Sequence, residues 1–185
     1  FSELIRNANK TGIFTQLNFS LKSLLLAHAF TVSKKSVLLI TLDDRIAEEF
    51  SDDLKLLLGS EQVACLPDYE VLAYEERSPH YVIRSERIKV LTDILSHEKK
   101  VITLSIRSLI QALTPSSILS EFILTVQQGQ EMDMSDLIEM LVNSGYENDF
   151  KVIKPGQISK RGGIIDIFSP NYDMPVRLEF FGDEI

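Results

Sequence analysis

Along residues 1–112, short continuous apolar runs alternate with longer stretches that have helical spacing. Residues 37–41 (VLLIT) are an unbroken β-rich run, which predicts a strand covered on both faces of a sheet. Residues 63–66 and 101–104 are predicted as two further short strands. Because helical stretches separate these strands, their order predicts an α/β domain with a mainly parallel sheet.

The helical stretches have recognisable starts and stops. Asp43 or Asp44 is a candidate N-cap, and Gly59 is the candidate end of the same helix. Another helix is predicted to begin at Ser78 and Pro79, since proline is favoured in the first turn. The remaining predicted helices cover residues 3–9, 21–30 and 107–113.

After Pro115 the pattern changes to one helix and several short strands. Asp133 is a candidate cap of that helix, and Gly145 is its predicted end. Strands are predicted at residues 121–126, 151–153, 157–161, 164–168 and 176–181, with a turn at Pro170 and Asn171. A helix against hairpins is an α+β arrangement, so an α/β domain is predicted at 1–117 and a small α+β domain at 118–185.

The chain has 185 residues, of which 44% are apolar and 25% are charged, as in ordinary soluble globular proteins. No apolar run approaches the length of about 18 residues that a membrane span requires, and no secretory signal opens the chain. Phe1 is not a methionine, and Ile185 falls within an apolar, strand-like pattern, so we expect a piece of a longer polypeptide.

Charge and cysteine usage narrow the classes of ligand. The net charge of −8 opposes binding to phosphate backbones unless a local basic patch compensates. Cys65 is the only cysteine, which excludes an internal disulfide and fits a reducing cytoplasm. His28, His80 and His97 lie far apart without metal-ligand spacing, so no metal site is predicted.

The turn into the first long helix is where a nucleotide-binding α/β domain would carry its phosphate loop. Lys22 and Ser23 are present there, but no glycine occurs between Gly12 and Gly59. Glycines let consecutive backbone amides approach the phosphates closely. The sequence therefore predicts that Lys22 and Ser23 do not hold ATP, and the chain shows no other catalytic motif.

The last predicted strand offers a candidate docking face. Alternation gives an apolar set of Val176, Leu178 and Phe180 and a mixed set of Arg177, Glu179 and Phe181. The apolar set suits a core, whereas an exposed arginine with an exposed phenylalanine is typical of an interface hot spot. In the alternative interpretation, Phe181 packs beneath a neighbouring segment and Arg177 pairs with Glu179 or another acid.

Basic residues cluster in sequence near this strand. Gly162 and Gly163 predict a tight turn or bulge between two strands. The candidate basic patch consists of Lys154, Lys160, Arg161 and Arg177. Such a patch within an acidic chain suits an acidic protein partner or DNA.

Three segments resemble one family of bacterial repair proteins. They are RGGIIDIFSPNYDMPVRLEFFGDEI (161–185), LPDYEVLAYEERSPHYVIRSERIKVL (66–91) and MDMSDLIEMLVNSGYENDFKVIKPGQISKRGG (132–163). In this family, which includes UvrB and the transcription-repair coupling factors, an RGG pattern precedes an arginine and an ending like EFFGDEI. The resemblance covers nearly the whole chain and is most specific in its last third.

Two departures from UvrB favour the coupling factors. UvrB-like proteins keep a glycine-rich ATP loop, which this chain lacks. They also carry a tyrosine-rich hairpin that probes damaged DNA, whereas residues 67–80 hold only Tyr69 and Tyr74. The resemblance implies a degenerate P-loop, RecA-like parallel-sheet domain followed by a small domain like the second domain of UvrB.

The resemblance also implies protein docking without catalysis and without a cofactor in this chain. The family's second domain binds UvrA, and its contacting residues fall, motif by motif, on Arg161, Arg177 and Phe181. ATP and Mg²⁺ belong to a translocase motor elsewhere in such proteins, which reach RNA polymerase and double-stranded DNA through other domains. In the family, another part of the full-length protein masks the UvrA-binding surface.

Two alternatives remain open. In the first, the chain is half of a UvrB-type ATPase in which Lys22 and Ser23 still hold phosphate. In the second, it is a DNA-contacting domain that uses Lys154, Lys160 and Arg161. The missing glycines oppose the first alternative, and the net charge of −8 opposes the second.

Overall fold

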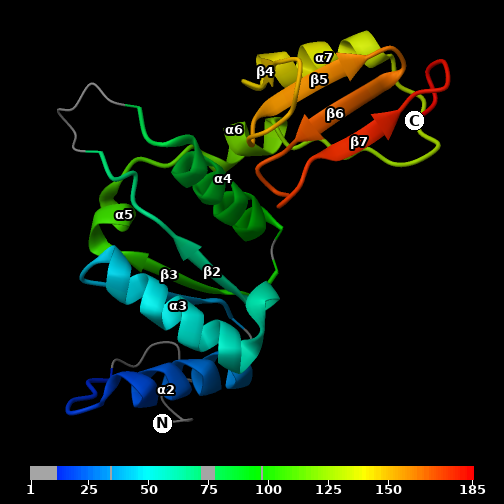
Figure 1. The fold of residues 1–185 in the computed structure, drawn as a ribbon. Helices are drawn as coiled ribbons and strands as arrows, with labels where there is room; N and C mark the ends of the chain where they lie inside the picture. Colours follow the sequence, from blue (N-terminus) through cyan, green and yellow to red (C-terminus); the bar gives the residue numbers. More distant parts are fainter. Residues whose placement is uncertain (1–11, 34, 72–77, 97) are drawn as a thin grey trace. The chain divides into compact units, whose positions relative to one another are not determined.

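The structure, a computed structural model, describes residues 12–33, 35–71, 78–96 and 98–185 (Figure 1). Its contacts divide the chain into two compact units. The first unit lies within Phe1–Ser78 and Ser96–Ala112, and the second comprises Pro79–Leu95 and Leu113–Ile185. Residues 79–95 thus group with the second unit, whereas the predicted division at residue 117 kept them in the first. The division into domains at that residue stays a prediction.

The first unit is built on a parallel sheet with the strand order β1-β3-β2. Its strands are β1 (Val37–Thr41), β2 (Val63–Leu66) and β3 (Val101–Ser105). Its described helices are α2 (Phe19–Val32), α3 (Asp44–Leu58), the 3-10 turn η1 (Ser60–Gln62) and α5 (Ile106–Ile110). The prediction of an α/β unit with parallel strands is confirmed, and the strands lie at the apolar runs that predicted them.

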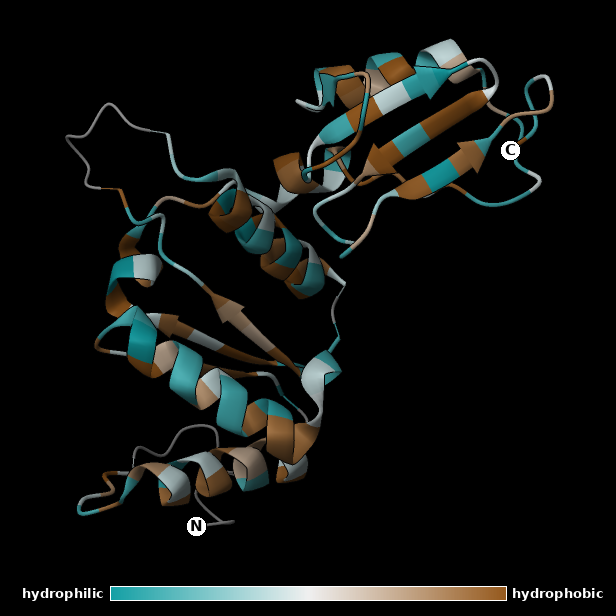
Figure 2. Cartoon of the chain, in the orientation of Figure 1, coloured by the Kyte–Doolittle hydropathy of each residue, from teal (hydrophilic) through white to brown (hydrophobic). Residues whose placement is uncertain are grey.

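Helix α3 begins and ends at the predicted residues. The Asp43 side chain accepts a hydrogen bond from the backbone nitrogen of Ile46 at 2.9 Å, which satisfies an amide of the first turn. Gly59 ends the helix with a φ of 96°, a conformation that favours glycine. Polar and apolar residues alternate around α3 (Figure 2), and its apolar side packs on the sheet.

The core of the first unit lies between the sheet, α3 and α2. Its buried residues are Ala27, Phe30, Phe50, Leu54, Val63 and Val101. On β1, Leu38 and Ile40 project from the opposite face and remain 55% and 46% exposed. Among the described residues, the prediction that residues 37–41 are covered on both faces is therefore wrong, because the core with α2 and α3 takes up Val37 and Leu39 on one face only.

The second unit contains a four-stranded sheet with the order β4-β5-β6-β7. Its elements are α4 (Tyr81–Leu95), α6 (Ser116–Glu121), α7 (Met134–Asn143), β4 (Glu147–Asn148), β5 (Gln157–Arg161), β6 (Ile164–Phe168) and β7 (Val176–Glu179). Strand β4 pairs parallel with β5, and the other pairings are antiparallel. Helix α7 covers one face of the sheet, which confirms a helix packed against a hairpin.

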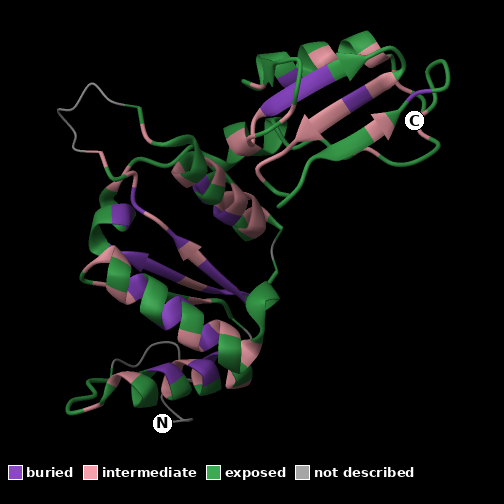
Figure 3. Ribbon diagram, viewed as in Figure 1, coloured by how far each residue is buried: buried purple, intermediate pink, exposed green. Residues whose placement is uncertain are grey.

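The buried residues of the second unit are Leu137, Leu141, Ile158, Ile165 and Phe180. They come from α7, β5, β6 and the segment after β7, so the helix and the hairpins share one core. Burial is strong along the first part of β5, whereas most of β7 is exposed (Figure 3).

Two strands predicted in the second unit are wrong. Residues 116–121 form α6, and residues 123–127 are not in a strand. The helix begins there because Pro115 stands at its N-cap and its carbonyl accepts a hydrogen bond from the Leu119 nitrogen at 2.9 Å. Residues 151–153 also form no strand, because the backbone nitrogen of Ile153 donates to the Gln157 side chain at 2.9 Å rather than to a neighbouring strand.

The remaining differences are at helix ends. Helix α4 begins at Tyr81, two residues after Pro79, and α5 covers residues 106–110 rather than 107–113 because the Ser105 hydroxyl caps the Ser108 nitrogen at 3.0 Å. The helix predicted at residues 3–9 lies outside the described residues. None of the described helices has the length and apolar character that crossing a membrane requires.

Candidate docking face

The outer face of the second sheet is the side opposite α7. Ile158 and Ile165 point toward α7, so alternation sends Ser159 and Asp166 to the outer side. The antiparallel register places Asp166 opposite Ser159 on one side and opposite Arg177 on the other. A carboxylate and a guanidinium therefore meet as a cross-strand pair on this face.

Arg177 and Asp166 form a bidentate ion pair. Arg177 Nε donates to Oδ1 at 2.7 Å, and Nη2 donates to Oδ2 at 3.0 Å. The hydrogen bond from Arg177 lowers the pKa of Asp166, and the same bond raises the pKa of Arg177. Arg177 thus pairs with an acid, as the alternative interpretation held, but its side chain remains 55% exposed, as the docking interpretation requires. The pair thus holds a guanidinium in a fixed direction while leaving it open to a partner.

The two phenylalanines after β7 have opposite environments. Phe180 is only 7% exposed and packs in the core, whereas Phe181 is 80% exposed. The Phe181 nitrogen donates to the Glu184 carbonyl at 2.9 Å, so its backbone is held by a turn. The predicted exposure of Arg177 and Phe181 is confirmed. Val176, predicted to face the core, is 38% exposed because it begins the strand at the edge of the sheet.

The glycine pair shapes the connection between β5 and β6. Gly162 has a φ of 59°, which a tight turn requires, and the predicted turn is confirmed. A Cβ on Gly163 would lie 2.9 Å from the carbonyl oxygen of Phe180. The Phe180 nitrogen donates to the Gly163 carbonyl at 2.7 Å, so the missing side chain lets the segment with both phenylalanines come close.

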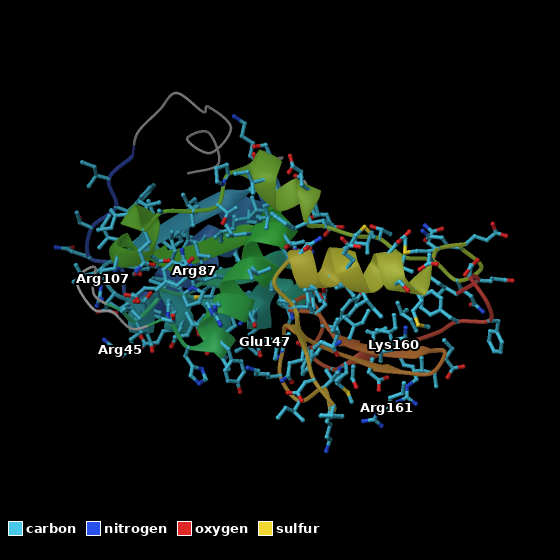
Figure 4. The ribbon with its side chains drawn as sticks, turned by 90° about the horizontal axis from the view of Figure 1, so that it is seen from above. Arg45, Arg87, Arg107, Glu147, Lys160 and Arg161 are labelled. Atoms are coloured by element: carbon cyan, nitrogen blue, oxygen red, sulfur yellow. The ribbon has the colours of Figure 1, made fainter. Side chains whose placement is uncertain are left out.

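The four basic residues predicted as one patch do not gather in one place. Arg161 and Lys160 lie on opposite sides of the sheet, Lys160 on the side of α7 (Figure 4). Lys154 pairs with Glu147 at 2.9 Å. Arg161 and Arg177 do lie together: both line one shallow hollow on the outer face, with Lys151, Val152, Asp166 and Pro175. We call Arg161, Arg177 and Phe181 the docking face.

Lys22 and Ser23 lie in the first turns of α2. In the described residues 12–18 no strand precedes them. Ser23 is buried, and its hydroxyl donates to Asp53 Oδ2 at 2.9 Å. The Asn18 side chain caps the helix by accepting from the Leu21 nitrogen at 2.9 Å. The serine and the helix N-terminus are thus already used within the protein.

The described part of the chain offers little support for a metal site or for a reactive cysteine. It holds no group of three or more histidine, cysteine, aspartate or glutamate side chains that could bind a metal ion. Cys65 is free, and burial raises the pKa of its thiol. A thiol with a raised pKa is a weak nucleophile at neutral pH.

Sequence reasoning missed two residues of the outer face. Asp166, the partner of Arg177, would follow from pairing residues 164–168 with 176–179 as a hairpin. Phe150 was missed because it follows the polar residues Glu147 to Asp149, in a stretch with no apolar periodicity. Only the path of the chain brings Phe150 beside Arg161, whose Nη2 donates to its carbonyl at 2.6 Å.

The docking face falls inside a region shared with known proteins. Residues 124–185 match the profile of the UvrB interaction domain family. A transcription-repair-coupling factor from Myxococcus xanthus is 36% identical over 153 residues, which cover 79% of this chain. One from Staphylococcus aureus is 31% identical over 173 residues, or 94% of this chain. The chain belongs to the transcription-repair-coupling factor family.

The family relationship has defined limits. The matched region spans only 13% of the Myxococcus xanthus coupling factor and 15% of the Staphylococcus aureus one. The coupling factor from Staphylococcus haemolyticus gives the same picture, at 29% identity over 173 residues. The chain is therefore related to one part of these coupling factors. Arg161, Arg177 and Phe181 lie within its own match to the UvrB interaction domain, residues 124–185.

Proposed function

We propose that this chain is a non-catalytic docking module that binds UvrA through Arg161, Arg177 and Phe181. The observation that carries the proposal is that the region matched by the UvrB interaction domain presents two exposed groups: the guanidinium of Arg177, held by Asp166, and the ring of Phe181. Arginine and aromatic residues dominate protein–protein hot spots, because they combine apolar area with directed hydrogen bonds. The hairpins hold both groups, so little order has to be gained on binding.

The proposed role of the first unit is that of a scaffold. We interpret it as a RecA-like fold with a degenerate P-loop, in which Lys22 and Ser23 do not bind a nucleotide. The lack of glycines from residue 13 to residue 58 and the bond from Ser23 to Asp53 support this interpretation. The DNA-contacting alternative is less well supported, because Lys154 pairs with Glu147 and Lys160 lies on the other side of the sheet from Arg161.

In the parent protein, UvrA docking would connect two processes. We propose that an ATP- and Mg²⁺-dependent motor outside this chain moves on double-stranded DNA, acts on RNA polymerase, and brings UvrA to the same place in the cytoplasm. The docking face would then recruit nucleotide excision repair. Masking of the face by another part of the parent protein belongs to the same proposal.

Calorimetric titration tests the module with two ligands in parallel. UvrA added to the chain is expected to give saturable binding, whereas ATP with Mg²⁺ is expected to give no saturable heat. The chain should also not hydrolyse ATP. Absence of UvrA binding would contradict the docking function, and micromolar ATP binding that a Lys22→Ala substitution abolishes would contradict its non-catalytic character.

A further inference from the structure

Residues 149–154 lie along the outer side of β5 and are tied to it by side chains. Gln157 Oε1 accepts hydrogen bonds from the backbone nitrogens of Ile153 at 2.9 Å and Lys154 at 3.1 Å, while its Nε2 donates to Asp149 Oδ2 at 3.1 Å. Ser159 Oγ donates to the Phe150 carbonyl at 3.0 Å. Successive outward side chains of β5 thus fix this segment.

The side chains that fix the segment are themselves largely buried. Gln157 is 3% exposed and Ser159 is 2% exposed, so their polar groups serve the hydrogen bonds to residues 149–154 and do not contact solvent. Arg161 adds a third tie, because it donates to the same Phe150 carbonyl at 2.6 Å. The backbone of Phe150 is therefore held by two donors from β5.

Phe150 itself is 93% exposed, although its backbone is held. Because its backbone is already held, only the two side-chain torsions of Phe150 have to be ordered when a partner buries the ring. It also offers a large apolar area, which makes phenylalanine a frequent anchor in interface pockets. This combination indicates a contact residue rather than a loosely placed loop side chain.

Phe150 adjoins the docking face through Arg161. A shallow hollow is lined by Asn148, Asp149, Phe150, Ser159, Lys160 and Arg161, and Arg161 also lines the hollow that contains Arg177. The strand order places β5 and β7 two strands apart, a separation of about 10 Å. Phe150 is tied to β5 and Phe181 follows β7, so the two phenylalanines come from different strands, as do Arg161 on β5 and Arg177 on β7.

We propose that Phe150 is a second aromatic anchor of the docking face, inserted into an apolar pocket of UvrA whose rim carries carboxylates. This inference rests on the proposed function and adds the β4–β5 side of the sheet to the contact. The charge of the hollow that contains Arg177 supports a partner with carboxylates. It is lined by the cations Lys151, Arg161 and Arg177, with Asp166 as its one carboxylate. An acidic rim would meet these cations, and the pocket would take the phenylalanine.

The test is a calorimetric titration of UvrA with the Phe150→Ala chain. The dissociation constant is expected to rise by about 10- to 100-fold, as for truncation of an interface anchor. Leu56→Ala is the matched control, because Leu56 is 88% exposed but lies on α3 of the first unit. Phe150→Leu keeps most of the apolar area and is expected to fall between wild type and Phe150→Ala. Circular dichroism verifies that each variant is folded.

The outcomes separate this inference from the proposed function. Wild-type affinity of Phe150→Ala, together with weakened binding of Arg177→Ala, would overturn the role of Phe150 and leave UvrA docking intact. No binding of UvrA by the wild-type chain would overturn the docking function itself. Equal weakening by Phe150→Ala and Leu56→Ala would also count against Phe150, because the effect would not be specific to this side of the sheet.

Discussion

Arg177→Ala and Phe181→Ala are each expected to weaken binding of this chain to UvrA by about 30- to 1000-fold, equivalent to roughly 2–4 kcal/mol. Removing the Arg177 side chain deletes an exposed, directed guanidinium and leaves Asp166 without its bidentate partner. Removing the Phe181 ring deletes an apolar surface that is 80% exposed in the free chain. Calorimetric titration with purified UvrA measures both losses.

Matched controls make this result specific. Arg45→Ala removes another exposed arginine, which pairs with Glu49 on α3 of the first unit. Leu56→Ala removes an apolar side chain that is 88% exposed on the same helix. Both controls are expected to bind UvrA like wild type, because they lie outside the docking face. Wild-type affinity in both Arg177→Ala and Phe181→Ala would reject the face.

The core beneath the docking face should be sensitive to a single truncation. Leu137→Ala is expected to lower the free energy of unfolding by about 2–5 kcal/mol, because Leu137 is fully buried between α7 and the sheet and leaves a cavity. Met140→Ala on the same helix is expected to cost no more than about 1 kcal/mol, since Met140 is 40% exposed. Urea denaturation followed by circular dichroism compares the two variants.

Equal destabilisation by Leu137→Ala and Met140→Ala would contradict the packing of α7 on the sheet. The comparison matters for function, because Ile165 and Phe180 belong to the same core as Leu137. Phe180 directly precedes Phe181, and Ile165 directly precedes Asp166, so the buried residues determine where the exposed ones point.

Sequence patterns predicted those elements whose local signals agree with their tertiary contacts. The β-rich run at residues 37–41 became β1, and the Gly162–Gly163 pair became the predicted turn between β5 and β6. Residues 151–153 had a strand-like pattern, but the Gln157 side chain takes the backbone nitrogens that a strand would need. A contact with a side chain several residues away is invisible to periodicity.

The docking face shows the same division. Alternation alone placed Phe180 inside and Phe181 outside, because a period of two is a property of every strand. To predict the Asp166–Arg177 pair, one would have to know the register of the hairpin. To predict the position of Phe150, one would have to know that residues 149–154 run beside β5. Residue identity supplied the chemistry at these positions, and tertiary structure decided which groups meet.

Amide hydrogen exchange of the chain with and without UvrA tests the central claim most directly, because it reports the contacted surface without any substitution. The account predicts slower exchange in residues 147–181, at the ends of β5 and β7 and in the segment before β5, with no change in residues 37–66. Protection confined to residues 37–66, with unchanged exchange in residues 147–181, would contradict it.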